Sequence, residues 1–260
     1  MLVYPQLTTG TLAQFPVRKE RRLRTVVNSL GDRSTIKLAD PQGAITAWRL
    51  EYANLSDAEM ANLQQFFIST EGSLNVFTFL DPTGNLFAWS DHLDNEAWTV
   101  GPYISLTANV IDPFGGSNGW QISNSGEGPQ SISQALSAPG GYLYTLSAYV
   151  RSSSPTVVTL LVGTARADLV CGTGWQRITF SARGDATAQS CEFGLEIAAN
   201  TSIDVFGLQA EPQPAASRYK ACTTGGVYEN AYFRDDTLQA TTNDANRHAV
   251  TVNIVNADSL

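Results

Sequence analysis

Residues 55–89 read LSDAEMANLQQFFISTEGSLNVFTFLDPTGNLFAW, and this stretch decides the fold of the N-terminal part of the chain. Ser56 suits a helix N-cap, and Glu59 follows at the spacing of a capping box. The apolar residues that follow recur at the spacing of one helix face: Met60, Leu63 and Phe67. We therefore predict a helix of about 12–14 residues that begins after Ser56.

The periodicity changes where this helix ends. Gly72 is placed to end the helix in a left-handed turn. Residues 74–80 alternate in the manner of a β-strand. Asp81-Pro82-Thr83-Gly84 then supplies turn chemistry, with proline at the second position and glycine at the fourth. The stretch thus predicts one capped helix, one aromatic strand and a closing turn.

The composition indicates a mainly β protein. The chain has 260 residues, of which 43% are hydrophobic and 15% charged, and this length suits one large domain or two modest ones. We predict a small β-domain with one α-helix, together with a β-sandwich (jelly-roll) domain. No signal peptide opens the sequence, and no apolar run approaches the ~20 residues that span a bilayer. We expect a soluble protein made in the cytoplasm.

The net charge of −8 is unevenly distributed. Residues 1–85 hold eight cationic and eight acidic side chains, whereas residues 86–260 hold eight and sixteen. Such an acidic chain has no general electrostatic reason to bind nucleic acid or an anionic membrane. The three cysteines lack zinc-site spacing and are expected to be free thiols, with pairing of Cys171 and Cys191 as the alternative.

One basic cluster stands out near the N-terminus, and its five cations are Arg18, Lys19, Arg21, Arg22 and Arg24. Three interpretations are open: a solvated edge strand whose charges discourage aggregation, a contact with another subunit, or a contact with nucleic acid. A turn at Gly31-Asp32 and a strand over 34–38 follow. A second turn is expected at 40–43, and a strand over 44–52 leads into the helix.

The second part of the chain contains eight segments of strand length and no helical pattern, which favours a β-sandwich or jelly roll. These segments are 103–110, 119–124, 130–136, 141–151, 156–163, 175–182, 191–198 and 203–210. Residues 248–255 alternate cleanly but have no neighbouring strand of their own, so they must join a sheet made elsewhere. We predict that 1–85 and 221–260 form one domain, into which 86–220 are inserted.

Signals for catalysis are weak. Ser90-Asp91-His92 holds triad residue types, but adjacent residues cannot converge as a triad requires. Asp235-Asp236 offers two carboxylates without an obvious pocket partner. We expect no enzyme activity, no cofactor and no metal, with a calcium ion at Asp112 and Asp204 as an alternative.

Aromatic residues are the better candidates for a binding role, because an aromatic face suits the apolar face of a pyranose. The competing interpretation is that each ring fills the sandwich core. The candidates for a sugar-stacking platform are Trp98, Trp120, Trp175, Tyr103 and Tyr149.

A family resemblance emerges from these motifs. A capped helix that runs into Phe77-Thr78-Phe79-Leu80-Asp81-Pro82 resembles the N-terminal domain of distal tail and minor tail proteins of tailed phages of the siphophage type. The entry to the second part, residues 85–90 followed by Trp98, resembles the start of carbohydrate-binding-module jelly rolls. Its exit, residues 207–211 followed by Ser217-Arg218-Tyr219, resembles their last strand.

The resemblance implies a virion structural protein of the tail tip or baseplate. Such proteins form a ring, usually a hexamer, at the distal end of the tail tube, where they contact tail tube and tail hub proteins. The five cations of the basic cluster would then lie at the subunit interface. The outer jelly roll would face a host-surface glycan or carry a receptor-binding protein. The alternative function is a freestanding carbohydrate-binding or adhesion module without a role in virion assembly.

Overall fold

The computed structural model describes residues 2–257, which belong to two compact units. Unit 1 comprises Met1–Thr8, Ala13–Phe79 and Tyr228–Leu260, and unit 2 comprises Thr9–Leu12 and Leu80–Val227. The described residues form one α-helix and three antiparallel sheets, so the predicted mainly β fold class is confirmed. Over the same range, no helix is both long and apolar enough to cross a membrane.

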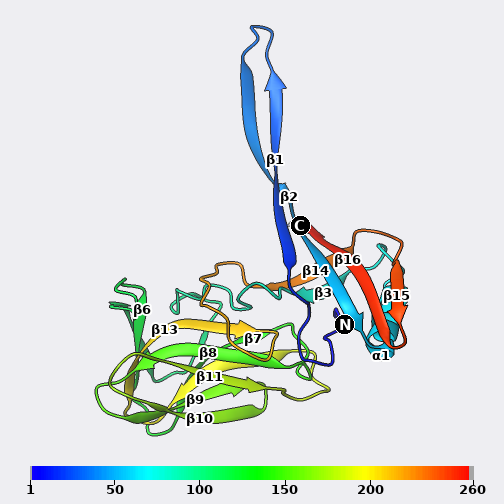
Figure 1. Cartoon of the computed structure of the whole chain (residues 1–260). Helices are drawn as coiled ribbons and strands as arrows, with labels where there is room; N and C mark the ends of the chain where they lie inside the picture. Colours follow the sequence, from blue (N-terminus) through cyan, green and yellow to red (C-terminus); the bar gives the residue numbers. More distant parts are fainter. Residues whose placement is uncertain (1, 258–260) are drawn as a thin grey trace. The chain divides into compact units, whose positions relative to one another are not determined.

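Unit 1 is built on one six-stranded sheet. Its strands run in the order β1 (Val17–Ser29), β2 (Thr35–Leu55), β16 (Arg247–Ala257), β14 (Val227–Phe233) and β3 (Phe77–Leu80), and β15 (Ala240–Asp244) pairs with β16 (Figure 1). β16 pairs antiparallel with β2, from His248↔Leu55 to Ala257↔Ile45. A strand from the C-terminal part of the chain thus lies in the middle of a sheet that the N-terminal part begins.

The single helix, α1 (Asp57–Ser69), begins as the sequence predicts. The Ser56 hydroxyl accepts a hydrogen bond from the Glu59 N–H (3.3 Å), and the Ser56 N–H donates to the Glu59 carboxylate (3.0 Å). Glu71 and Gly72, with φ of 53° and 66°, form the left-handed turn that ends it. Strand β3 is shorter than predicted because the chain pairs only from Phe77 onward.

Aromatic packing holds α1 against the sheet. The ring of Phe66 lies 5.1 Å from that of Phe77, which in turn lies 5.0 Å from that of Phe233, and Trp48 contacts Phe79 at 4.9 Å. The Phe66–Phe77 and Trp48–Phe79 pairs are edge-to-face and the Phe77–Phe233 pair is tilted, and aromatic pairs of this kind add about 0.5–1.5 kcal/mol each to the burial of their apolar area. The sheet face that carries Trp48 is therefore the core face of unit 1, and the opposite face is not covered by α1.

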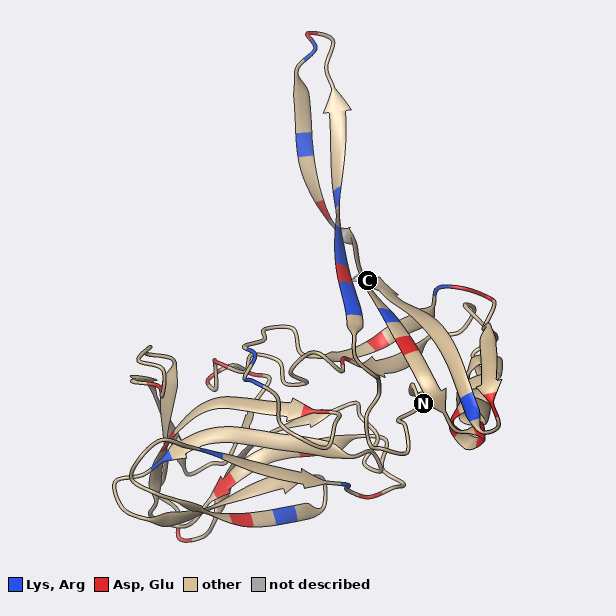
Figure 2. Ribbon diagram, in the orientation of Figure 1, with Lys and Arg blue, Asp and Glu red and all other residues tan. Residues whose placement is uncertain are grey.

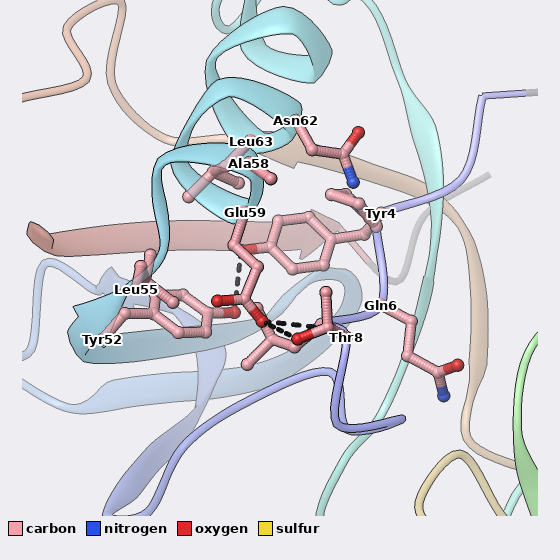
Figure 3. Close-up of a pocket in the computed structure, with 11 residues that line it drawn as sticks. Tyr4, Gln6, Thr8, Tyr52, Leu55, Ala58, Glu59, Asn62 and Leu63 are labelled. Carbon is pink, nitrogen blue, oxygen red and sulfur yellow. Dashed lines mark hydrogen bonds between the residues drawn. The ribbon is translucent and has the colours of Figure 1, made fainter. Parts of the chain in front are cut away.

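The first residues of the chain are fixed to the helix start (Figure 3). The N–H and hydroxyl of Thr8 donate to the Glu59 carboxylate at 3.0 and 2.6 Å, and the hydroxyls of Tyr4 and Tyr52 lie 2.9 Å apart. Burial raises the pKa of Tyr52. A small cavity of about 80 Å³ remains between this segment and the first turn of α1.

Strands β1 and β2 form a long hairpin that extends beyond the rest of the sheet (Figure 1). The second turn expected at 40–43 is wrong, because the chain does not reverse there. Instead, the register shifts between the pairs Arg22↔Ile45 and Arg24↔Asp40, and the extra residues of β2 form an irregularity in one continuous strand. Strand pairing between β2 and β16 ends at Ile45. Beyond that point, among residues 2–257, the outer part of the hairpin is a ribbon of two strands, β1 and β2.

Unit 2 is a β-sandwich of two five-stranded sheets. One sheet has the order β10 (Ala165–Cys171), β9 (Thr156–Val162), β12 (Cys191–Ile197), β7 (Gln130–Leu136) and β4 (Thr99–Val100). The other has the order β11 (Gln176–Ala182), β8 (Tyr144–Arg151), β13 (Ser202–Glu211), β6 (Gly119–Asn124) and β5 (Ile104–Val110).

Alternate residues of β8 form the inner face of the second sheet. Tyr144, Leu146 and their alternate neighbours are buried, and the ring of Tyr144 meets that of Phe193 edge-on at 4.9 Å. Strand β10 was not expected from the sequence; it pairs with β9 across a tight turn at Gly163, whose φ is 56°. The three cysteines are free, so the alternative pairing of Cys171 with Cys191 is not formed.

Candidate functional site

The outer face of the β11-β8-β13-β6-β5 sheet carries a row of polar and aromatic side chains. Register places Arg151 opposite Asp204 and Asp204 opposite Gln121. Arg151 Nε lies 2.8 Å from Asp204 Oδ2, and Gln121 Nε2 donates to the other carboxylate oxygen at 3.4 Å. The Arg151 guanidinium lies 4.8 Å from the ring centroid of Trp175. One ion pair is thus bounded by an indole ring and a carboxamide.

A second row on the same face is aromatic. Tyr149 pairs with Arg177 on one side and with Phe206 on the other. The Arg177 guanidinium lies 5.4 Å from the Tyr149 ring centroid, and the Phe206 ring lies 6.0 Å from it. The exposed ring of Phe114, from the loop before β6, meets Tyr149 edge-on at 5.5 Å. The two rows together join cationic, anionic and aromatic groups in one patch, which we call the Arg151 patch.

A hollow of about 260 Å³ opens beside the first row, and Gln121, Arg151, Thr173 and Asp204 are among its lining residues. Arginine offers only donors, a carboxylate only acceptors and a carboxamide both. A polyhydroxylated ligand needs this combination, since each hydroxyl both donates and accepts. The polar groups that line the hollow can therefore hydrogen-bond a pair of sugar hydroxyls, and Trp175 lies behind Arg151 at its edge.

The segment after β13, residues 213–220, covers the other half of this sheet face. The Thr145 hydroxyl donates to the Gln213 carbonyl (2.7 Å), and the Ser181 hydroxyl donates to the Pro214 carbonyl (3.1 Å). The Gln209 carboxamide accepts from the Lys220 N–H at 2.8 Å. Because these groups already have partners within the chain, the part of the face left for a ligand is the Arg151 patch.

The five aromatic residues predicted for a sugar platform do not share one surface. Trp98 and Trp120 are buried, and their indole N–H groups donate to the carbonyls of Trp89 and Asp91. Tyr103 is 57% exposed, near the start of β5. Trp175 and Tyr149 are half-buried and belong to the two neighbouring rows of the Arg151 patch.

The charged members of the patch were missed as sugar contacts by sequence reasoning. Asp204 was considered as a calcium ligand, but its carboxylate pairs with Arg151, whereas Asp112 accepts from the backbone N–H groups of Phe114 and Gly116. Within the described residues, no three acidic, histidine or cysteine side chains converge as a metal site. Cross-strand register was the missing signal, because it alone places Arg151 beside Asp204.

The residues considered for catalysis are engaged in separate places. The Ser90 hydroxyl accepts from the Cys222 N–H at 2.9 Å. Asp235 accepts from the Asn253 carboxamide, and Asp236 accepts from the N–H and hydroxyl of Ser73. The carboxylates of Asp235 and Asp236 therefore serve to hold loops of unit 1 in the structure described here.

The basic cluster lies on β1, which is the edge strand of the unit 1 sheet (Figure 2). All five of its cations are exposed: Arg18, Lys19, Arg21, Arg22 and Arg24. The ammonium of Lys19 lies 5.5 Å from the Trp48 ring centroid, and Arg22 pairs with Glu20 at 2.8 Å. Arg24 pairs with Asp40 across the hairpin.

The outer part of the hairpin also exposes aliphatic side chains. Val26 lies opposite Leu38, and Ile36 lies two positions along β2 from Leu38, so all three share one face of the ribbon. They are 38%, 52% and 45% exposed, respectively. Leu23, Val27 and Leu30 are exposed as well. We call residues 17–40 the hairpin arm, and the face with Val26, Ile36 and Leu38 its apolar face.

Comparisons with known proteins give structural similarity alone. No protein-family model and no curated protein sequence matches the chain. The C-terminal family 22 carbohydrate-binding module of Clostridium thermocellum Xyn10B matches with 12% identity over 53% of this chain and 99% of that chain (TM-score 0.43). The CBM22-1 xylan-binding domain of Paenibacillus barcinonensis Xyn10C matches with 16% identity over 52% and 99% (TM-score 0.42).

A phage protein also appears among the similar structures. Tailspike protein 4 of bacteriophage CBA120, in its enzymatically active domain, matches with 14% identity over 51% of this chain and 22% of that chain (TM-score 0.39). The matched region is thus about half of this chain and about a fifth of the tailspike. At these scores, none of the similarities decides a function.

Proposed function

We propose that this chain is a structural component of a phage or prophage-derived tail tip, in which unit 1 assembles with copies of itself into a ring. The observation that carries the proposal is the apolar face of the hairpin arm. An isolated two-stranded ribbon is at best marginally stable in water, and exposed apolar strands are sites where another chain adds. The solvent-exposed Val26, Ile36 and Leu38 favour a neighbouring molecule as their cover.

The tail-tip assignment draws on the helix–strand unit. The capping box of α1 and the aromatic strand β3 behind it are the features by which the sequence resembles distal tail and minor tail proteins. In the proposed role the chain resides in the virion at the distal end of the tail tube. There the ring contacts tail tube proteins on one side and tail hub proteins on the other. The role is assembly and binding without catalysis.

The proposed task of unit 2 is contact with the host surface. The Arg151 patch supports a glycan as the ligand, because it combines an ion pair, a carboxamide and two aromatic rings beside a hollow. The half of the face covered by residues 213–220 leaves a patch suited to a short glycan segment or a chain end. A receptor-binding protein is the other partner for this unit.

The second candidate is a freestanding glycan-binding module. The Arg151 patch favours it, because glycan contact needs only unit 2 and no assembly. That function, however, leaves the exposed apolar face of the hairpin arm without a purpose.

Light scattering and negative-stain imaging of the full chain, across a wide range of concentration, test the proposal. We expect a concentration-dependent closed ring. A protein that stays monomeric at every concentration while binding glycans on an array would contradict the ring and support the freestanding module. If no glycan on an array binds, the proposed glycan contact of unit 2 is wrong, and assembly remains as the proposed role of the chain.

A further inference from the structure

The hairpin arm has a complementary surface elsewhere in unit 1. A groove of about 960 Å³ runs over the outer face of the sheet, the face not covered by α1. Its lining includes Phe15, Glu51, Ala53, Asp235 and Thr251. This volume lies at the upper end of the about 300–1,000 Å³ that is usual for ligand pockets. We call it the outer groove.

The charges of the arm and of the rest of the chain are opposite. The hairpin arm holds seven cationic and three acidic side chains, which leaves nine cationic and twenty-one acidic side chains in the rest of the chain. The arm thus carries a net charge of +4 and the remainder −12. Four of the arm's cations lie at its base, where β1 pairs with residues 45–49 of β2, and the outer ribbon, residues 23–40, holds three cations and two carboxylates. The outer groove itself is lined by three carboxylates, those of Glu51, Asp235 and Asp236, and one cation, Arg234. Complementary charge of this kind steers association and fixes the partner.

The outer part of the arm, which carries Val26, Ile36 and Leu38, cannot reach the groove of its own copy. Both lie on β2, with Leu38 near the arm's tip and Glu51 in the groove, thirteen positions further along the strand. At about 3.3 Å per residue, these two positions lie roughly 40 Å apart. Because β2 is continuous between them, the outer part of the arm extends beyond the rest of its own sheet (Figure 1).

We infer that the hairpin arm of one copy docks into the outer groove of a second copy. The apolar face with Val26, Ile36 and Leu38 lies on Phe15 and Ala53 of the groove, and the basic residues of the arm approach Asp235 and its acidic neighbours. The contact uses two different surfaces, so it is heterologous: each copy offers one arm and one groove. A heterologous contact closes into a ring or continues as a filament. This inference rests on the proposed assembly function and names its interface.

Paired substitutions separate the arm from the groove. The arm variant V26E/L38K replaces the apolar pair by an ion pair in the same cross-strand position, so the ribbon keeps its net charge and gains a stabilising cross-strand pair. Its matched control, T25E/A39K, places the same ion pair on the opposite face of the ribbon. We expect V26E/L38K to abolish assembly and T25E/A39K to assemble as the wild type does.

The groove variant A53R/T251R fills the groove and neutralises its net negative charge. Its matched control, Q64R/Q65R, adds the same charge on the exposed face of α1. We expect A53R/T251R to stay monomeric and Q64R/Q65R to assemble. A mixture of the arm variant and the groove variant retains one intact arm and one intact groove, so it should form a one-to-one dimer and nothing larger, as measured by light scattering.

The outcomes distinguish the interface from the function. A dimer in the mixture, with monomers in each separate sample, supports the docking and shows that both variants fold. Full assembly by either variant alone overturns the docking, while the ring itself stands. Loss of assembly in the arm variant only, with rings from the groove variant, points to packing of arm against arm and also overturns it. If the wild-type protein never assembles, both the proposed ring and the proposed docking of the arm are refuted.

Discussion

Glu59 should stabilise the start of α1 far more as a carboxylate than as an amide. Its two oxygens accept hydrogen bonds from the N–H and hydroxyl of Thr8 and from the N–H and hydroxyl of Ser56, at 2.6–3.0 Å (Figure 3). In Glu59→Gln, one oxygen becomes an NH₂ group that cannot accept, so the backbone N–H of either Thr8 or Ser56 loses its acceptor, while the neighbouring hydroxyl must turn to accept instead of donating. Either the N-terminal segment or the capping box then loses its anchor.

The loss of stability in Glu59→Gln can be estimated from these hydrogen bonds. A hydrogen bond to a charged group contributes about 1.5–3 kcal/mol, and the partial exposure of Glu59 reduces this to a net loss of about 1–2 kcal/mol. Burial by itself would raise the pKa of Glu59, but the hydrogen bonds from Thr8 and Ser56 outweigh it and lower the pKa to about 2. A depressed carboxyl pKa adds stability above the ordinary value of about 4.5, and that stability is lost as the pH falls toward 2.

Hydrogen exchange of the helix amides, residues 57–69, measures the effect locally. We expect protection to fall by roughly 5–30-fold in Glu59→Gln at pH 7, and the gap between the variant and the wild type to narrow at about pH 3. Glu71→Gln is the matched control, because Glu71 is exposed just beyond the helix end. Unchanged protection at pH 7, or a gap of the same size at both pH values, would refute the role assigned to this carboxylate.

Further predictions concern the core, the thiols and the glycan patch. Phe233→Ala should cost unit 1 about 3–5 kcal/mol in denaturant unfolding, and a loss below about 1 kcal/mol would contradict its central place among the rings. Burial raises the pKa of Cys171 to about 11 and of Cys191 to about 12, so iodoacetamide at pH 8 should label the half-buried Cys222 first, and equal labelling would be inconsistent. Trp175→Ala should weaken binding of any glycan found on an array about threefold to tenfold, and an unchanged dissociation constant would exclude Trp175 from the site.

Local chemistry was readable from the sequence because its partners are close in the chain. Ser56 and Glu59 define the helix start within four residues, and the turn after β3 has the predicted form, with the Thr83 N–H donating to the Asp81 carboxylate at 2.8 Å. These elements needed no knowledge of the tertiary fold.

Non-local register was not readable, and the Arg151 patch depends on it. β13 pairs with β8 through a register shift between Phe206 and Gln209, where Gly207 has a φ of 66° and lies against the ring of Tyr219. On one side of this shift, Phe206 lies opposite Tyr149 and Asp204 opposite Arg151, and no local sequence pattern specifies these pairs. The sequence offered five tryptophan and tyrosine residues as sugar contacts, but the rings of Trp98 and Trp120 are buried in the core, because large rings gain most from burial.

The topology of unit 1 links its assembly surfaces to the synthesis of unit 2. β16 lies between β2 and β14 in the sheet, yet its residues follow those of unit 2 in the chain. Until β16 is made, β2 lacks its inner neighbour, and the outer groove lacks the wall that Thr251 and Asn253 provide. The hairpin arm needs only β1 and β2 and can form earlier. The hairpin arm of a chain therefore forms before its outer groove during synthesis. A growing chain can dock its arm into the groove of a finished copy, but it cannot bind another copy's arm until unit 2 and β16 have been translated.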